Sequence, residues 1–267
     1  MNDPRPIGVF DSGMGGLTVL AELVKALPGE DFIYLGDTAR IPYGANSPRT
    51  VLRFSREDAA FLLKHDIKLI IIACNTSAAH AESTLADELP VPVLGVIKPG
   101  VEALLTRTRN RRVGVLGTRS TIKSGAYEKE ILSRDAGLTV FSRPCPLFVS
   151  LVEEGWIDKK VTSLVIQEYL AEIEREDVDA AILGCTHYPL LKEAIRREYP
   201  NLTLIDSSQE VARAAKERLT ELNLHAGRAD GGSVQIFLTD MSEQIESLTR
   251  LFYGSPFQSI SEVNLND

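Results

Sequence analysis

The sequence predicts an α/β protein with two pseudo-symmetric lobes, each a mostly parallel sheet flanked by helices, and a site between the lobes. Short apolar runs alternate with helical patterns almost throughout, which is typical of parallel sheets covered by helices on both faces. Two cysteines, Cys74 and Cys185, also lie in matching positions just beyond two of these runs. If the lobes face each other, we expect one thiol on each side of a small bound molecule.

Nine apolar runs predict buried strands. They span residues 7–10, 32–35, 69–73, 93–96, 113–116, 138–141, 180–183, 202–205 and 234–238. The segments between them place apolar residues on one helical face, as Leu17, Leu20 and Leu23 do. The last stretch adds a helical pattern at 243–252, and we expect the polar tail from Ser255 onward to be poorly ordered.

A faint duplication supports two related lobes. Residues 8–12 (GVFDS) resemble 114–118 (GVLGT), and a similar separation along the chain relates the two cysteine turns. We expect a first lobe at 1–97, completed by 207–267, and a second lobe at 98–206.

Composition excludes several classes of function. The net charge of −8 offers no basic excess for a nucleic-acid surface. Three scattered cysteines without a CxxC spacing predict neither a disulfide framework nor a zinc site. The polar start at 1–6 does not resemble a signal peptide, and no apolar run reaches the roughly 18 residues that cross a bilayer. We therefore expect a cytoplasmic protein that binds neither nucleic acid nor membrane.

Polar turns follow five of the predicted strands. They lie at residues 11–13, 36–37, 74–76, 117–118 and 185–187. Ligands of open parallel sheets bind beyond the carboxyl ends of the strands. Backbone N–H groups at helix starts, with Ser and Thr hydroxyls, make good carboxylate sites, so two carboxylates could be bound without an arginine clamp. The alternative is that these residues are ordinary helix N-caps.

The glycine run at 13–16 raises the question of a nucleotide site. Neither GxGxxG nor GxxxxGK[ST] is present, so a tight turn close to the substrate is favoured over a phosphate loop. The lysines have no distinctive Schiff-base context, and pyridoxal phosphate is not implied. We expect no cofactor and no metal.

Two thiols at equivalent strand ends suit the removal of a proton from one face of a carbon and its return to the other. Cysteine acts as a base through its thiolate, and a strand-end, helix-start position is expected to lower its pKa. Asp11 and His187 are candidate partners, each near one cysteine. The alternatives are an N-cap for Asp11 and a structural hydrogen bond for His187. Cys145, between two prolines, is expected to be a packing residue.

Five motifs carry a family resemblance. They occupy residues 8–16 (GVFDSGMGG), 34–37 (YLGD), 41–44 (IPYG), 73–77 (ACNTS) and 184–189 (GCTHYP). In their order and spacing, over nearly the whole chain, they resemble the glutamate racemases of the cofactor-independent aspartate/glutamate racemase superfamily.

The resemblance implies that Cys74 and Cys185 are the two acid/base residues, assisted by Asp11, Glu153 and His187. It also implies a set of residues in contact with glutamate. These are Asp11, Ser12, Tyr43, Gly44, Asn75, Thr76, Thr186 and His187. Asp37 belongs to a matching motif, and its role is left open.

The activity implied is the interconversion of L-glutamate and D-glutamate by two-base proton transfer at Cα, which supplies D-glutamate for peptidoglycan. A homodimer is also implied. One alternative is a racemase of aspartate or a related amino acid, because the cysteine pair indicates the reaction better than the side-chain pocket. The other is a non-catalytic two-lobed protein that binds an amino acid, although binding alone needs neither cysteine.

Overall fold

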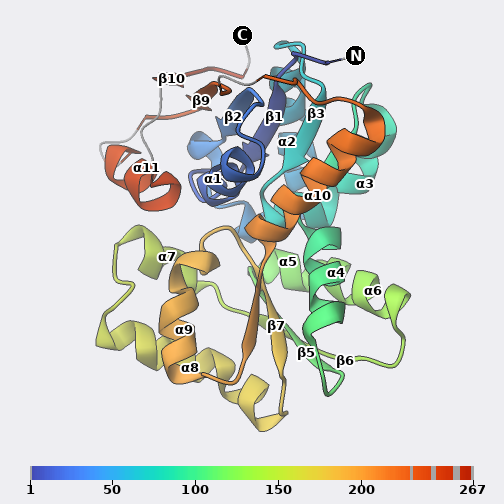
Figure 1. The fold of residues 1–267 in the computed structure, drawn as a ribbon. Coiled ribbons are helices and arrows are strands. Elements are labelled where there is room, and N and C mark those ends of the chain that lie inside the picture. Colours follow the sequence, from blue (N-terminus) through green and yellow to red (C-terminus); the bar gives the residue numbers. More distant parts are fainter. Residues whose placement is uncertain (1, 229–230, 242–244, 255–258, 266–267) are drawn as a thin grey trace.

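The computed structural model describes residues 2–228, 231–241, 245–254 and 259–265. Two parallel sheets form the centres of two lobes, and helices cover both (Figure 1). This arrangement confirms the predicted α/β class with two lobes.

The first sheet has the strand order β10-β9-β2-β1-β3-β4, and neighbouring strands run parallel. Its strands are β1 (Ile7–Asp11), β2 (Phe32–Gly36), β3 (Leu69–Ile72), β4 (Val93–Gly95), β9 (Val234–Leu238) and β10 (Ser259–Glu262). The three central strands are buried along their whole length, which explains why the sequence shows continuous apolar runs there rather than alternation.

The second sheet has the order β6-β5-β7-β8, also with parallel neighbours. Its strands are β5 (Arg112–Gly117), β6 (Thr139–Pro144), β7 (Ala180–Gly184) and β8 (Thr203–Asp206). All nine predicted strands are thus present, with bounds that differ by a few residues from the apolar runs.

Helices connect the strands as parallel pairing requires. Those beside the first sheet are α1 (Leu17–Ala26), α2 (Pro48–Leu63), α3 (Asn75–Glu88), α10 (Ser207–Leu222) and α11 (Ile245–Tyr253), with the 3₁₀ turns η1 (Thr38–Arg40) and η2 (Tyr43–Ala45). Those of the second lobe are α4 (Ile97–Arg107), α5 (Arg119–Ser124), α6 (Ala126–Arg134), α7 (Leu147–Glu153), α8 (Lys160–Arg175) and α9 (Lys192–Glu198), with the 3₁₀ turn η3 (Tyr188–Leu191).

The C-terminal stretch differs from its prediction. Residues 259–262 form β10, which pairs with β9, although the tail from Ser255 onward was expected to be poorly ordered; residues 255–258 lie outside the described part. The helical pattern predicted at 243–252 corresponds to α11, and its first two residues also lie outside that part. Only Ile260 is a large apolar residue in β10, so pairing with β9 rather than local pattern forms this strand.

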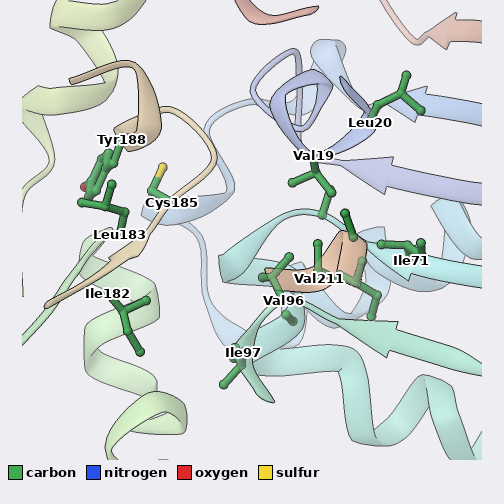
Figure 2. Close-up of a cluster of buried hydrophobic side chains, with 14 of the residues drawn as sticks. Val19, Leu20, Ile71, Val96, Ile97, Ile182, Leu183, Cys185, Tyr188 and Val211 are labelled. Atoms are coloured by element: carbon green, nitrogen blue, oxygen red, sulfur yellow. The ribbon is translucent and has the colours of Figure 1, made fainter. Parts of the chain in front are cut away.

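One apolar core joins the two lobes. The cluster of buried side chains runs from the first sheet through α4 and α10 into the second sheet. Figure 2 shows part of it, with Val19 and Ile71 in the first lobe and Leu183 and Tyr188 beside Cys185 in the second. The strand ends of both lobes are therefore supported by a shared, close-packed interior.

We propose that the lobes divide at residues 97/98 and 206/207. The membership of the two sheets supports these boundaries, because β1–β4 and β9–β10 belong to one sheet and β5–β8 to the other.

Across the described ranges, none of the helices combines the length and apolar character needed to span a membrane.

Candidate active site

A cavity of about 240 Å³ lies between the two lobes. Its wall combines residues that follow strands of both sheets, as expected for ligand sites of parallel sheets. The predicted residues on this wall are Ser12, Tyr43, Gly44, Cys74, Asn75, Thr76, Glu153, Cys185, Thr186 and His187. The structure therefore brings both thiols to one small cavity, with Asp11 as the single predicted residue outside its lining.

Cys74 is the N-cap of α3, at the end of β3. Its Sγ accepts a hydrogen bond from the backbone N–H of Ser77 at 3.4 Å, and its thiol lies 3.6 Å from the hydroxyl of Ser12. Burial, and after it the negative charge of Asp11, raise the pKa of the Cys74 thiol to about 11, against the opposing effect of its hydrogen bonds with Ser77 and Ser12. The expectation of a lowered pKa is wrong for Cys74, because desolvation and a nearby carboxylate outweigh the helix N-terminus.

This pKa gives a direct prediction for the ligand-free protein. We expect the rate of Cys74 alkylation by iodoacetamide to keep rising with pH towards about 11, because the thiolate is the reactive form. Peptide mapping by mass spectrometry measures the rate at this residue, with a small free thiol, whose pKa is about 8.5, as the reference. A rate at Cys74 that levels off near neutral pH would contradict the prediction.

Cys185 has a different environment. It follows β7 and precedes the 3₁₀ turn η3, whereas Cys74 is followed directly by an α-helix. Its Sγ lies 3.8 Å from Nδ1 of His187, and Nε2 of the same ring lies 3.0 Å from a carboxylate oxygen of Glu153. A hydrogen-bonded ring, rather than the start of an α-helix, is therefore the polar partner of this thiol.

His187 carries a positive charge at neutral pH. Burial alone would lower its pKa, but the interactions with Cys185 and Glu153 outweigh burial and raise it to about 10. The charged imidazolium of His187 therefore lies between the thiol of Cys185 and the carboxylate of Glu153. The two cysteines are thus prepared differently: Cys74 as a thiol and Cys185 beside a cation.

Asp11 lies behind the cavity wall and is fully buried. Its Oδ2 accepts hydrogen bonds from the backbone N–H groups of Gly13 at 3.1 Å and Gly16 at 3.0 Å, so it stabilises the turn before α1, whose N-cap is Gly16 rather than Asp11. Its Oδ1 is buried and has no hydrogen-bond partner in the part of the chain that the structure describes. Burial raises the pKa of Asp11, while the charge of His187 opposes that shift. Asp11 therefore interacts electrostatically with both Cys74 and His187.

The glycine turn brings the lobes into close contact. A Cβ atom at Gly15 would overlap the hydroxyl of Thr186 and the ring of His187, and one at Gly16 would overlap Asp11. The hydroxyl of Thr18 donates to the backbone oxygen of Thr186 at 3.1 Å, which joins the start of α1 to the second lobe. Glycine is needed here for close approach between backbone and side chains, in agreement with the predicted tight turn.

Hydroxyl groups cover another side of the cavity. Those of Thr76, Thr118 and Thr121 lie 3.0–3.1 Å from one another, across the boundary between the lobes. Tyr127 donates to Oδ1 of Asn75 at 2.5 Å, which leaves the amide NH₂ of Asn75 available as a donor. Thr118 also lines the cavity; it belongs to one of the five predicted polar turns and is the duplicated equivalent of Ser12, but it was not named among the glutamate contacts.

The last helix contributes apolar wall that sequence reasoning also missed. Ile245 and Leu248 of α11 line the cavity, and the ring of Phe252 stands nearly perpendicular to that of His187, 5.0 Å away. Figure 1 shows α11 beside the first lobe, above α7. No local motif marks this helix as part of a site, because its role depends on packing against α1, far away in the sequence.

The cavity can bind carboxylates without a lysine or an arginine. Within the described ranges its lining includes neither lysine nor arginine, and the donors are hydroxyls, the Asn75 amide, His187 and backbone N–H groups at the start of α3. Such groups bind carboxylates well at a helix N-terminus. The described residues contain no cluster of three or more His, Cys, Asp or Glu side chains placed to bind a metal ion.

Known proteins resemble this chain over nearly its full length. A family model described as Asp/Glu/hydantoin racemase matches residues 7–215. A glutamate racemase of Persephonella marina is 49% identical, over 93% of each chain. The fold is similar to that of a glutamate racemase isoform of Bacillus anthracis (TM-score 0.94, 36% identity, 98% of each chain). It is also similar to a glutamate racemase of Francisella tularensis solved with D-glutamate (TM-score 0.93, 40% identity, 99% of each chain).

Proposed function

Because the chain belongs to the Asp/Glu/hydantoin racemase family, we propose that it interconverts L-glutamate and D-glutamate. The observation that carries the proposal is the presence of Cys74 and Cys185 on the wall of one small cavity, at equivalent strand ends of two lobes. A binding protein would need neither thiol, whereas inversion at a carbon needs an acid and a base on opposite faces.

The reaction is a proton exchange at Cα. One cysteine thiolate removes the Cα proton and becomes a thiol, while the other cysteine donates its thiol proton to the opposite face and becomes a thiolate. The substrate leaves with inverted configuration, and the reverse reaction exchanges the two roles. In the ligand-free protein the raised pKa of Cys74 keeps this residue protonated, so it can act as the acid, with Cys185 as the opposing base.

The barrier arises from the weak acidity of a carbon next to a carboxylate. Hydrogen-bond donors aimed at the carboxylate stabilise the negative charge that develops there. Their effect is stronger where water is excluded. Thr76, Asn75 and Thr186 supply such donors, and the apolar side chains of Ile245 and Leu248 cover the cavity. Glu153 orients the ring of His187, so its effect on Cys185 is indirect.

Glutamate is favoured over aspartate because the similar proteins reported above are glutamate racemases, one of them solved with D-glutamate. Aspartate remains the rival substrate, since the cysteine pair serves either amino acid.

A turnover assay decides between these substrates. We expect purified protein to racemise L-glutamate and D-glutamate, and aspartate far more slowly, as followed by circular dichroism. Dialysis against a chelator should leave the activity intact, because both bases belong to the chain. Faster turnover of aspartate would establish the rival racemase, and glutamate binding without loss of the Cα proton to solvent would establish a binding protein.

We also propose where the protein works and what its product is used for. A cytoplasmic enzyme that supplies D-glutamate for peptidoglycan, and that works as a homodimer, is supported by the family resemblance. Three free cysteines, two of them in the site, suit a reducing compartment.

A further inference from the structure

A buried group of polar side chains lies behind Tyr43, on the side away from the cavity. Asp37 and Asp58 are both fully buried, and the hydroxyl of Tyr43 contacts both: Oδ2 of Asp37 closely, and Oδ2 of Asp58 at 3.0 Å. Arg40 binds Oδ2 of Asp37 at 2.6 Å and Oδ1 of Asp58 at 3.2 Å, and it also pairs with Glu57. The group joins the turn after β2 to α2.

The hydroxyl of Tyr43 has one proton to donate, and it faces two carboxyl oxygens. If both acids were ionised, one of these contacts would place two oxygens together without a proton between them. A proton on Oδ2 of Asp58 resolves the conflict: Asp58 donates to the Tyr43 oxygen, and Tyr43 donates to Asp37. Every polar contact in the group is then a hydrogen bond.

The other contacts identify Asp58 as the protonated acid. Asp37 accepts from Arg40, from Tyr43 and from the hydroxyl of Thr239 at 2.9 Å, so each of its partners supplies the proton of the hydrogen bond. Among the described residues, the side chain of Asp58 has only the 3.2 Å contact with Arg40 besides that with Tyr43. Burial raises the pKa of Asp58 well above its ordinary value, and the charge of Asp37 raises it further. The single positive charge of Arg40 also neutralises two negative charges, on Asp37 and Glu57, more completely than it would neutralise three.

Tyr43 connects this group to the reacting side of the cavity. Its side chain is 1% exposed and packs in one cluster with Val51, Phe54 and Cys74. The rings of Tyr43 and Phe54 are 5.3 Å apart, and the guanidinium of Arg40 lies over the Phe54 ring at 4.2 Å. The orientation of the Tyr43 ring therefore sets part of the wall beside Cys74.

We propose that Asp58 is a neutral carboxylic acid that positions Tyr43, and through Tyr43 the wall of the cavity beside Cys74. The effect on turnover rests on the proposed racemase activity, whereas the protonation of Asp58 does not. Asp58 is thus a positioning residue of the site that touches neither the cavity nor the substrate.

Infrared difference spectroscopy tests the protonation. At neutral pH, the spectrum of the unaltered protein minus that of Asp58→Asn should contain the carbonyl stretch of a protonated carboxylic acid, which is well separated from carboxylate bands. Glu57→Gln is the matched control, because Glu57 also pairs with Arg40 but does not contact Tyr43. The band should persist in Glu57→Gln.

Kinetics tests the positioning. Asparagine can donate to Tyr43 and accept from Arg40, so Asp58→Asn should retain kcat/KM within about threefold, whereas Asp58→Leu should lose at least about tenfold. Glu57→Gln should stay near the unaltered protein. Combining Asp58→Leu with Tyr43→Phe should cost little more than the worse single change, because both remove the same hydrogen bond.

The outcomes separate the two proposals. A missing carbonyl band, or an Asp58→Asn variant as impaired as Asp58→Leu, overturns the role of Asp58. If Asp58→Leu does not fold, the band and the retained activity of Asp58→Asn still decide. If the unaltered protein does not racemise glutamate, the proposed function fails, while the band still reports the protonation of Asp58.

Discussion

Cys74→Ala and Cys185→Ala should each lose racemisation by at least about a thousandfold, since each removes one of two obligatory proton carriers. Both residues line the same cavity, and each follows a strand of a different lobe. Circular dichroism of glutamate enantiomers measures the loss for each variant. Thermal unfolding of the same samples shows whether the fold persists.

Cys145→Ala is the matched control. Cys145 is fully buried, its thiol donates to the backbone oxygen of Arg143 at 3.6 Å, and it does not belong to the cavity lining. We expect its replacement to leave turnover nearly unchanged, with a small loss of stability from the cavity created. Substantial activity in either Cys74→Ala or Cys185→Ala would exclude the two-base reaction.

His187→Gln should lower kcat by roughly 100-fold, because the imidazolium assists Cys185 in taking or releasing a proton. The variant should also change how stability depends on pH. The folded pKa of His187 is about 10 against an ordinary 6.5, so its charged form is favoured by folding. This contribution is fully present below about 6.5 and disappears as pH rises through about 10. Denaturant unfolding at a series of pH values measures the difference between the two proteins.

His80→Gln provides a control of opposite sign. His80 is half-buried, lies 2.9 Å from the hydroxyl of Ser120, and has a pKa lowered by burial. Its contribution is therefore present above its ordinary pKa and disappears as pH falls. If the two variants showed the same pH trend, the charged state assigned to His187 would be wrong.

Much of the fold follows from local pattern. The apolar runs identified nine strands, most clearly the central ones, because parallel strands buried on both faces need continuous apolar sequence. β10 escaped prediction because its residues, Ser259–Glu262, are mostly polar and form a strand only by pairing with β9. The contribution of α11 to the cavity also depends on tertiary packing and carries no local signal.

The sequence predicted those site residues that lie in the turns directly after apolar strands. Cysteine turns at equivalent strand ends identified both thiols, and the same duplication makes Thr118 the equivalent of Ser12. The pKa of Cys74 could not be predicted, since it depends on burial and on the distance to Asp11 in the folded chain. Asp58 was missed for the same reason: its contact with Tyr43 joins α2 to a separate turn.

The isotope content of the product tests the central claim most directly. With L-glutamate as substrate in deuterated water, the donating thiol carries solvent deuterium before turnover begins. A two-base enzyme therefore delivers deuterium to Cα of the product, while recovered L-glutamate stays largely protiated at low conversion. The same result should be obtained from D-glutamate, with the two cysteines exchanging roles.

Mass spectrometry of the chromatographically separated enantiomers measures both pools of glutamate early in the reaction. We expect deuterium in nearly all of the newly formed enantiomer and little in the remaining substrate, in both directions. Extensive retention of protium in the product would mean that one group serves both faces of Cα. That result would contradict the assignment of Cys74 and Cys185 as a pair of opposed bases.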